Sequence, residues 1–190
     1  MQTMKLEQLA LPEVLLLTPT LRRDERGSFH ESWQQGRYRD AGLPELWVQD
    51  NVSRSQRGVL RGLHFQLPRG QAKLVSVMEG EILDVAVDVR RGSPNFGRAV
   101  TGALSSALAQ QLFIPAGFAH GFVVTSDEAV VHYKCSDYYV PECEKTISWN
   151  DPLLAIDWPI DSPILSARDK EGRLLRDLST DELPAYHLEP

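Results

Sequence analysis

The sequence predicts an all-β fold of the jelly-roll type, a sandwich or barrel with a few short helices. Three observations predict it. Short runs rich in valine, isoleucine, leucine and aromatic residues recur along the chain, and their lengths are those of strands. The 13 glycines and 12 prolines are spread along the chain rather than gathered in one linker, which is the spacing of many turns. Segments with the periodicity of a helix are few.

The strands are expected in runs that turn residues such as Gly80, Pro94 and Gly117 separate. In chain order, strands are expected at 14–17, 46–55, 58–66, 73–77, 82–89, 97–104, 111–114, 121–124, 129–139 and 146–149. Two helical segments are expected beside them. One is a helix at 34–41 that ends before Gly42, and the other is a capped turn that begins at Ser179.

Length and composition limit the class of protein. With 190 residues we expect one domain over 1–190, with a jelly-roll core at about 12–150 and a C-terminal segment at 151–190 that packs on it. The hydrophobic fraction of 42% and charged fraction of 24% exclude a disordered or fibrous chain. A net charge of −6 without a basic block argues against nucleic-acid binding.

Neither a membrane span nor an export signal is expected. No apolar run approaches the roughly 18–20 residues of a transmembrane helix, and the first residues lack the apolar core of a signal peptide. The chain has two cysteines, Cys135 and Cys143, and without an export signal reduced thiols are expected rather than a disulfide. We therefore expect a cytoplasmic protein.

One histidine lies near the end of an expected strand, in the run RGLHFQ at 61–66. Strand alternation would place Arg61 and Leu63 on one face and Gly62, His64 and Gln66 on the other. A polar set with one histidine on a strand face is typical of a wet cavity inside a barrel. The alternative is a hydrogen-bonded core histidine, and composition alone leaves both interpretations open.

A second histidine follows a turn, in the pattern Pro115-x-Gly117-x-x-His120, which resembles the second conserved motif of cupins, the small jelly-roll barrels. Cupins that bind metal usually carry a His-x-His pair and a glutamate in the first motif. Here Gln66 stands at the second histidine position and Lys73 follows. Two histidines and an ammonium are a poor site for a divalent cation, so we expect no metal.

The order of the motifs resembles the dTDP-4-dehydrorhamnose 3,5-epimerase family over roughly residues 12 to 176. The motifs are DERGSFHE at 24–31, QDNVS at 49–53, VLRGLHFQ at 59–66, KLV at 73–75, DVAVDVR at 84–90, SPNFG at 93–97, IPAGFAHGF at 114–122, YKC at 133–135, YY at 138–139, WNDP at 149–152 and SARD at 166–169. The resemblance implies epimerisation of dTDP-4-dehydro-6-deoxy-D-glucose at C3 and C5 through an enolate. Because the ketone is already present, no redox cofactor is needed, and the chain shows no dinucleotide or phosphate-loop motif.

The resemblance also implies roles for individual residues. His64 matches the general base, Asp169 the carboxylate that pairs with it, and Tyr133 the general acid on the opposite face of the sugar. Lys73 matches the group that stabilises the oxyanion at C4. The positions that match substrate contacts are Arg26, Glu31, Gln49, Asp50, Asn51, Arg61, His120, Tyr139, Glu144 and Arg168.

One substrate contact departs from the family pattern, because Arg168 stands where the family often has lysine. The charge is kept but the reach differs. Members of the family pair as dimers through exposed strands, so we expect a homodimer in which Arg26 or Glu31 reaches the neighbour's site. Cys135 lacks the neighbours of a nucleophile.

The motifs leave other interpretations open. A single-position epimerase acting at C3 or C5 would carry almost the same motifs, and a non-catalytic cupin-like module could bind the same sugar nucleotide. A metal-dependent cupin enzyme is disfavoured by Gln66. The carboxylates Asp84 and Asp88 share one strand face. They are interpreted as structural groups that bond to Arg90 near the turn rather than as a catalytic acid pair.

Overall fold

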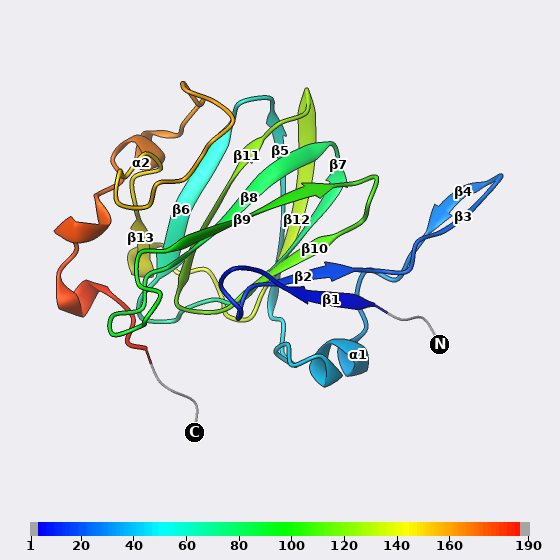
Figure 1. Cartoon of the computed structure of the whole chain (residues 1–190), viewed down its shortest axis with the longest axis horizontal. Coiled ribbons are helices and arrows are strands. Elements are labelled where there is room, and N and C mark those ends of the chain that lie inside the picture. The colour runs from blue at the N-terminus through cyan, green and yellow to red at the C-terminus, as the bar shows by residue number, and fades with distance from the viewer. Residues whose placement is uncertain (1–3, 187–190) are drawn as a thin grey trace.

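The computed structural model describes residues 4–186, and its main feature is a pair of antiparallel sheets that face each other (Figure 1). One sheet has six strands and the other five, and a separate two-stranded hairpin extends from them. Helices are few and short. The all-β prediction is confirmed. No helix in this described range is both long and apolar enough to cross a membrane.

Each sheet brings together strands that are distant in the sequence. In spatial order, the six-stranded sheet consists of β1 (Lys5–Gln8), β2 (Leu15–Thr18), β10 (Gln111–Ile114), β7 (Lys73–Glu79), β12 (Glu128–Cys135) and β5 (Gln49–Gln56). The five-stranded sheet consists of β13 (Glu144–Thr146), β6 (Leu60–Gln66), β11 (Phe118–Val124), β8 (Glu81–Asp88) and β9 (Ala99–Ser105). The hairpin consists of β3 (Arg22–Asp24) and β4 (Gly27–Phe29), and the helices are α1 (Gln35–Asp40), α2 (Ala167–Lys170) and the 3₁₀ turns η1 (Pro141–Cys143), η2 (Leu175–Asp177) and η3 (Thr180–Glu182).

Most expected strands have a counterpart in these sheets, and one expectation was wrong. The run at 111–114 is a strand with those bounds. The strand expected at 146–149 instead lies earlier in the chain, as β13 at 144–146. Strands β1, β3 and β4 were not expected, since every residue in them is exposed and no apolar alternation marks them. The capped turn is confirmed by reciprocal bonds between Ser179 and Glu182.

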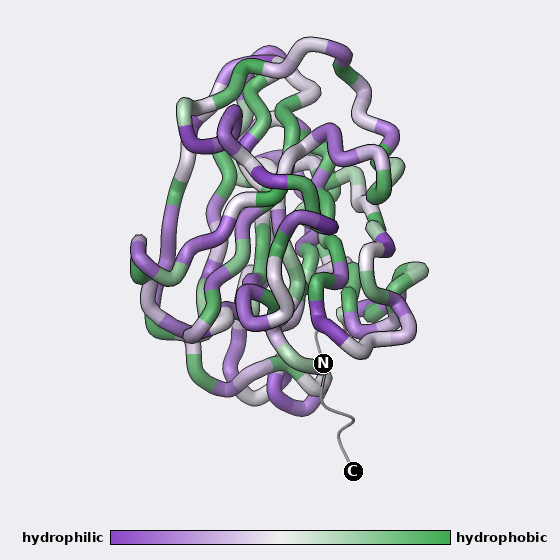
Figure 2. Tube along the Cα trace, turned by 90° about the vertical axis from the view of Figure 1, so that its left-hand side faces the viewer, coloured by the Kyte–Doolittle hydropathy of each residue, from purple (hydrophilic) through white to green (hydrophobic). Residues whose placement is uncertain are grey.

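The core has two main parts on either side of the five-stranded sheet. Alternating residues of β7 and β8, such as Val75 and Ile82, pack between the two sheets. The outer face of the five-stranded sheet packs against the C-terminal segment, through Leu154, Trp158 and Leu175. In Figure 2 hydrophobic stretches of the trace run through the middle of the molecule. Each fully buried leucine or valine stabilises the fold by about 1.5–3 kcal/mol.

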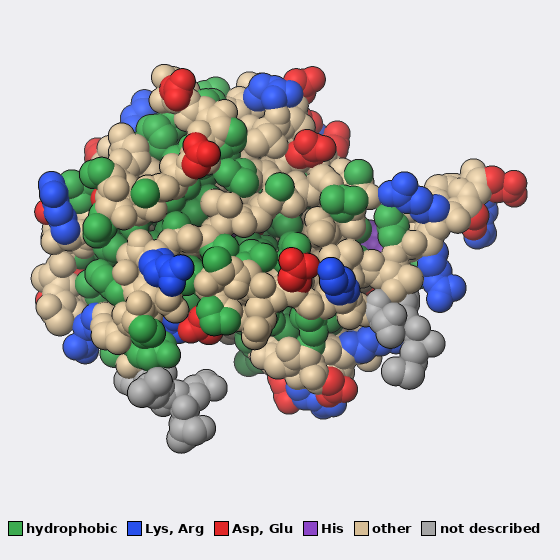
Figure 3. Space-filling view, in the orientation of Figure 1, with side chains coloured by type: hydrophobic (Ala, Val, Ile, Leu, Met, Phe, Trp, Pro, Cys, Tyr) green, Lys and Arg blue, Asp and Glu red, His purple; other side chains and the backbone are tan. Residues whose placement is uncertain are grey.

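The hairpin β3–β4 projects from the body of the molecule (Figure 1). Charged side chains of both signs lie at its tip in the space-filling view (Figure 3). Phe29, at the end of β4, is 68% exposed. A large aromatic side chain left this open on an extended arm is a feature of contact surfaces rather than of a free loop.

A bulge in β6 decides which of its side chains face the space between the sheets. His64 pairs with His120 on β11, but Arg61 pairs with Phe122, so β6 contains one more residue than β11 over this stretch. Gly62 fits here because its φ is +113° and a Cβ would lie 2.5 Å from the Cα of Gly121. Arg61 and His64 therefore share the inner face. The simple alternation expected from the sequence, which separated them, was wrong.

Candidate active site

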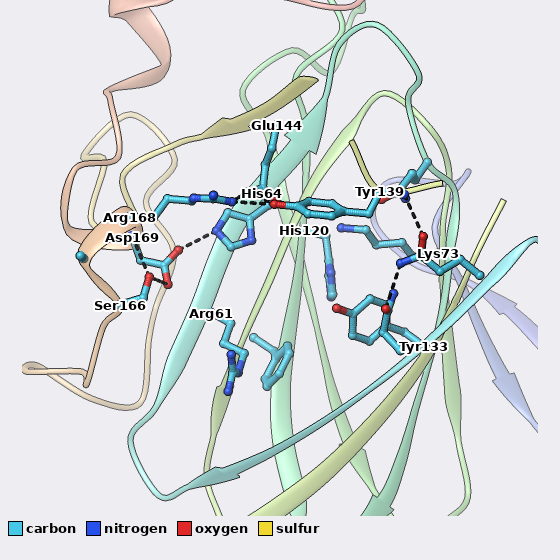
Figure 4. Close-up of a pocket in the computed structure, with 15 residues that line it drawn as sticks. Arg61, His64, Lys73, His120, Tyr133, Tyr139, Glu144, Ser166, Arg168 and Asp169 are labelled. Atoms are coloured by element: carbon cyan, nitrogen blue, oxygen red, sulfur yellow. Dashed lines mark hydrogen bonds and ion pairs between the residues drawn. The ribbon is translucent and has the colours of Figure 1, made fainter. Parts of the chain in front are cut away.

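A cavity of about 610 Å³ opens between the two sheets, and side chains from both sheets and from α2 line it (Figure 4). His64, Lys73, His120 and Tyr133 all point into it. The predicted site residues that line this cavity are Gln49, Asn51, Arg61, His64, Lys73, His120, Tyr133, Tyr139, Glu144, Arg168 and Asp169.

A histidine–aspartate pair forms one wall. Nε2 of His64 lies 2.6 Å from Oδ1 of Asp169, and the second carboxylate oxygen accepts a 2.7 Å hydrogen bond from the hydroxyl of Ser166. Asp169 is only 4% exposed. Burial raises the pKa of its carboxyl, but hydrogen bonds from His64, Ser166 and the Gly62 N–H outweigh burial and hold the pKa below its usual value. The ionised carboxylate fixes a proton on Nε2 and leaves Nδ1 of His64 free to accept one.

Tyr133 lies on the opposite wall. It belongs to β12 of the six-stranded sheet, whereas His64 belongs to β6 of the five-stranded sheet. Burial raises the pKa of the Tyr133 phenol, and the positive charge of Arg61 opposes that effect only in part. The phenol is therefore protonated at neutral pH. Within residues 4–186 its hydroxyl has no hydrogen-bond partner, so it is available to a molecule in the cavity.

Lys73 and His120 lie deeper between the sheets. Burial lowers the pKa of the Lys73 ammonium, and the nearby side chains of Cys135 and Asp84 partly restore it. Nε2 of His120 lies 2.6 Å from Oδ1 of Asp84, which is fully buried. The interpretation of Asp84 as a partner of Arg90 was therefore wrong, since Arg90 bonds to the other carboxylate of β8, Asp88.

Asp88 has the structural role expected from the sequence. Its Oδ1 accepts a 2.9 Å hydrogen bond from Nε of Arg90, and its Oδ2 accepts a 2.7 Å bond from Nη2. Ser93 donates a further 2.5 Å bond to Oδ2. Asp84 and Asp88 share a strand but belong to separate hydrogen-bond networks. Their positions on β8 alone therefore could not predict their different partners.

Three side chains bridge the mouth of the cavity. Nη1 of Arg168 donates a 2.8 Å hydrogen bond to the hydroxyl of Tyr139 and forms an ion pair with Glu144. The Tyr139 hydroxyl lies 3.3 Å from Oε2 of Glu144. The backbone N–H of Tyr139 bonds to Oε1 of Gln49 over 2.8 Å, which ties this rim to β5. A cation, a carboxylate and an aromatic ring therefore meet where a ligand would enter.

Three predicted binding residues do not line this cavity. Asp50 lies on the outer face of β5, because adjacent strand residues point to opposite faces, and it pairs there with Lys134. Gln49 and Asn51 line the cavity, but the prediction that Asp50 is also a substrate contact was wrong for this cavity. Arg26 lies on the β3–β4 hairpin, paired with Asp24, and Glu31 pairs with Arg37. All three side chains therefore lie outside the cavity of their own chain.

Ser166 is a site residue that was not predicted from the sequence. It caps α2, accepting a 3.1 Å hydrogen bond from the N–H of Asp169 while its own hydroxyl holds the carboxylate. A serine three residues before an aspartate is the pattern of a helix N-cap, and that signal could have identified it. Gln71 and Phe122 also line the cavity, but no sequence signal distinguishes them.

The donor groups of this region suit a metal poorly. Both cavity histidines use Nε2 to bond aspartates, and Gln66 is occupied elsewhere, since its amide donates to the carbonyl of Arg69 and accepts from the N–H of Val140. Throughout the described range, no three His, Cys, Asp or Glu side chains are grouped so that they could hold a metal ion. Carboxylate- and histidine-rich clusters are what divalent ions require.

Comparisons with known proteins agree on one family. Residues 8–177 match the family model described as dTDP-4-dehydrorhamnose 3,5-epimerase. The dTDP-4-dehydrorhamnose 3,5-epimerase of Pseudomonas aeruginosa is 52% identical, over 92% of this chain and 97% of that protein. The crystal structure of dTDP-6-deoxy-D-glucose-3,5-epimerase from Legionella pneumophila in complex with dTDP-4-keto-L-rhamnose superposes with a TM-score of 0.95. It is 48% identical and covers 98% of this chain and 100% of its own.

A relative with a narrower reaction is also similar. A 3′-monoepimerase from Streptomyces bikiniensis, in complex with dTDP-quinovose, superposes with a TM-score of 0.89. It is 36% identical and covers 95% of this chain and 93% of its own. A relative named for a reaction at one position therefore shares the fold, whereas the two relatives named 3,5-epimerases are more similar in sequence to this chain.

Proposed function

Since the chain belongs to the dTDP-4-dehydrorhamnose 3,5-epimerase family, and is an isomerase of dTDP-rhamnose biosynthesis, we propose that the cavity between its sheets is the active site. The observation that carries this proposal is the placement of His64 and Tyr133 on opposite sheets across one cavity. Inversion at a carbon next to a ketone needs a base on one face of the sugar and an acid on the other. Two facing sheets provide that arrangement.

The base in this proposal is Nδ1 of His64. It removes the proton from C5 or C3, and the electron pair of the broken C–H bond moves into the enolate, whose negative charge collects on the oxygen at C4. Asp169 stabilises the imidazolium that forms. The ammonium of Lys73 stabilises the oxyanion, and one donor of this kind contributes about 3–4 kcal/mol to lowering the barrier.

The acid is the phenol of Tyr133. It delivers its proton to the same carbon from the opposite side, which restores the ketone with inverted configuration. The tyrosinate then regains a proton from solvent, and the imidazolium of His64 releases one, so that the second centre can react. The raised pKa of Tyr133 supports this role, because the phenol holds its proton until the enolate forms.

The substrate in this proposal is dTDP-4-dehydro-6-deoxy-D-glucose. The Legionella relative was crystallised with a sugar nucleotide of this type. Arg61 and Arg168 lie at the cavity and suit the diphosphate, because the guanidinium fork matches phosphate oxygens. Tyr139 at the mouth would stack on the ligand. Arg168 would exchange its contact with Glu144 for the phosphate when the ligand enters.

Solvent deuterium tests both the reaction and its independence of metal. After dialysis against a chelator and transfer to D₂O, the enzyme is expected to place deuterium at C3 and C5 of the product, and proton NMR reads both positions. Its rate should equal that of undialysed enzyme, because Lys73 rather than a metal faces the oxyanion. A chain that only bound the sugar nucleotide would leave both protons in place, and a rate that zinc, iron or manganese restored would refute metal-free catalysis.

The homodimer is a further part of this proposal. The hairpin β3–β4 projects from the body of the molecule (Figure 1). It carries Arg26 and the exposed Phe29, which are not among the residues that line the cavity of their own chain. This is the position of an arm that reaches a second copy. We expect light scattering to give twice the chain mass of 21.4 kDa at micromolar concentration. A stable monomer would contradict the dimer.

An experiment with mixed subunits distinguishes a dimer whose subunits share their active sites from a dimer whose sites are independent. If Arg26 completes the partner's cavity, then mixing inactive Arg26→Ala and His64→Asn subunits restores activity, because one site of each mixed dimer has both groups. Random exchange in a two-fold dimer makes roughly a quarter of all sites intact. If Arg26 served its own cavity, every mixed site would lack one group and the mixture would stay inactive.

The compartment proposed for the enzyme is the cytoplasm. Cys135 and Cys143 are both free, and Cys135 is buried at the end of β12. Free thiols are typical of a reducing compartment. Among the described residues, the hydrogen-bond partner of the Cys135 sulfur is Nδ2 of Asn51, and no histidine pairs with this thiol as one would with a nucleophile.

A further inference from the structure

Asp84 is the most deeply buried charged group beside the cavity, and the mechanism above does not use it. It lies on β8, in the interior of the five-stranded sheet, with an exposed fraction of 0%. Its Oδ1 takes part in the contact with His120 and also accepts a 3.0 Å hydrogen bond from the N–H of Val85. Its Oδ2 is buried and has no hydrogen-bond partner among residues 4–186. A carboxylate in such a place is costly, so it needs a compensating charge or function.

The contact with His120 fixes the proton on one ring nitrogen. An ionised carboxylate can only accept hydrogen bonds, so across the 2.6 Å contact Nε2 of His120 must be the donor. Burial lowers the pKa of His120, with the neighbouring Lys73 and His64 acting in the same direction and Asp84 opposing them. The ring is therefore neutral, and Nδ1 carries a lone pair.

The second group near Asp84 is the ammonium of Lys73. The titratable groups around Lys73 are Asp84 on β8, His120 on β11, His64 on β6, and Tyr133 and Cys135 on β12. Burial raises the pKa values of both the Tyr133 phenol and the Cys135 thiol, so these two groups are neutral near pH 7. Asp84 is then the anion whose charge opposes the effect of burial on the pKa of Lys73.

We propose that Asp84 is a positioning residue of this enzyme, which acts mainly through His120 without touching the substrate. It holds His120 in the tautomer that presents Nδ1 as a hydrogen-bond acceptor for a hydroxyl of the sugar. Its negative charge also favours the ammonium form of Lys73, the group proposed to meet the developing oxyanion. The second part rests on the proposed role of Lys73, whereas the first part depends only on the contact between Asp84 and His120.

The tautomer of His120 is measurable in the unmodified enzyme. In ¹⁵N-labelled protein near pH 7, long-range ¹H–¹⁵N NMR is expected to show a neutral His120 ring with the proton on Nε2, assigned by the loss of its signals in His120→Gln. A proton on Nδ1, or a charged ring at that pH, would overturn the proposal. This test needs no variant of Asp84 to fold, and it stands whether or not Lys73 meets an oxyanion.

The charge effect is tested by Asp84→Asn, which keeps the shape of the side chain but removes its charge. Lys73 acts as an ammonium, so activity falls as the pH rises through its pKa. Without Asp84 that pKa is lower, and the alkaline limb of the kcat/KM profile moves to lower pH. At neutral pH kcat/KM should fall by about 10- to 100-fold, the usual loss when a supporting partner is removed.

Asp88→Asn is the matched control, because Asp88 is equally buried on the same strand but bonds to Arg90 and Ser93. It is expected to lower stability without moving the alkaline limb. An unmoved limb in Asp84→Asn, or equal movement in both variants, would overturn the charge effect. If Lys73→Ala kept the wild-type kcat, the role of Lys73 would fail while the tautomer of His120 still stood.

Discussion

Replacing His64 by asparagine is expected to abolish deuterium uptake and epimerisation together. Asparagine cannot accept the proton from carbon, so no enolate forms and neither C3 nor C5 exchanges with solvent. A general base contributes about 100- to 10,000-fold to the rate, and the loss should lie in kcat. The arginines at the cavity are unchanged, so the affinity for dTDP, measured by calorimetry, should change little.

His132→Asn is the matched control for that experiment. His132 lies on β12 but pairs with Asp50 across 3.3 Å on the outer face of the sheet, away from the cavity. Its loss should leave exchange and epimerisation at wild-type rates. If His64→Asn still exchanged deuterium at either position, a second base would have to serve that carbon, and the single-base mechanism would be wrong for it.

The sequence predicted the parts of the fold that depend on local pattern. The strand at 111–114 has four buried residues in a row between turn signals, and the capping serine of the last turn has its glutamate three residues later. Such features need no knowledge of the rest of the chain. The all-exposed strands β1, β3 and β4 have no local pattern, because their partners and surroundings rather than their composition make them strands.

The side chains of the site were harder to place, because long-range pairing decides them. The bulge that brings Arg61 and His64 to one face exists only because β6 lies against β11, and nothing in RGLHFQ signals the extra residue. The partner of Asp84 is 36 residues away on another strand. For Asp50 the reverse holds, since simple alternation along β5 predicts an outward side chain, whereas its match to the family motif indicates a substrate contact.

Tyr133→Phe is expected to separate deuterium exchange from inversion. The substitution deletes only the hydroxyl, which has no partner among the described residues, so no buried polar group is left unsatisfied and the fold should persist. His64 can still remove a proton and form the enolate. In D₂O its conjugate acid exchanges and returns deuterium to the face from which the proton left.

The variant should therefore exchange deuterium into the substrate while it inverts slowly. Inversion is expected to fall by about 100- to 10,000-fold, the usual contribution of a general acid. Exchange should fall much less, and proton NMR of recovered substrate and product measures both rates in one sample. Tyr138→Phe is the control, since Tyr138 is 55% exposed and its ring lies outside the cavity lining, so both of its rates should stay at wild-type values. Equal losses of exchange and inversion in Tyr133→Phe, or no loss of either, would refute the opposite-face role of Tyr133.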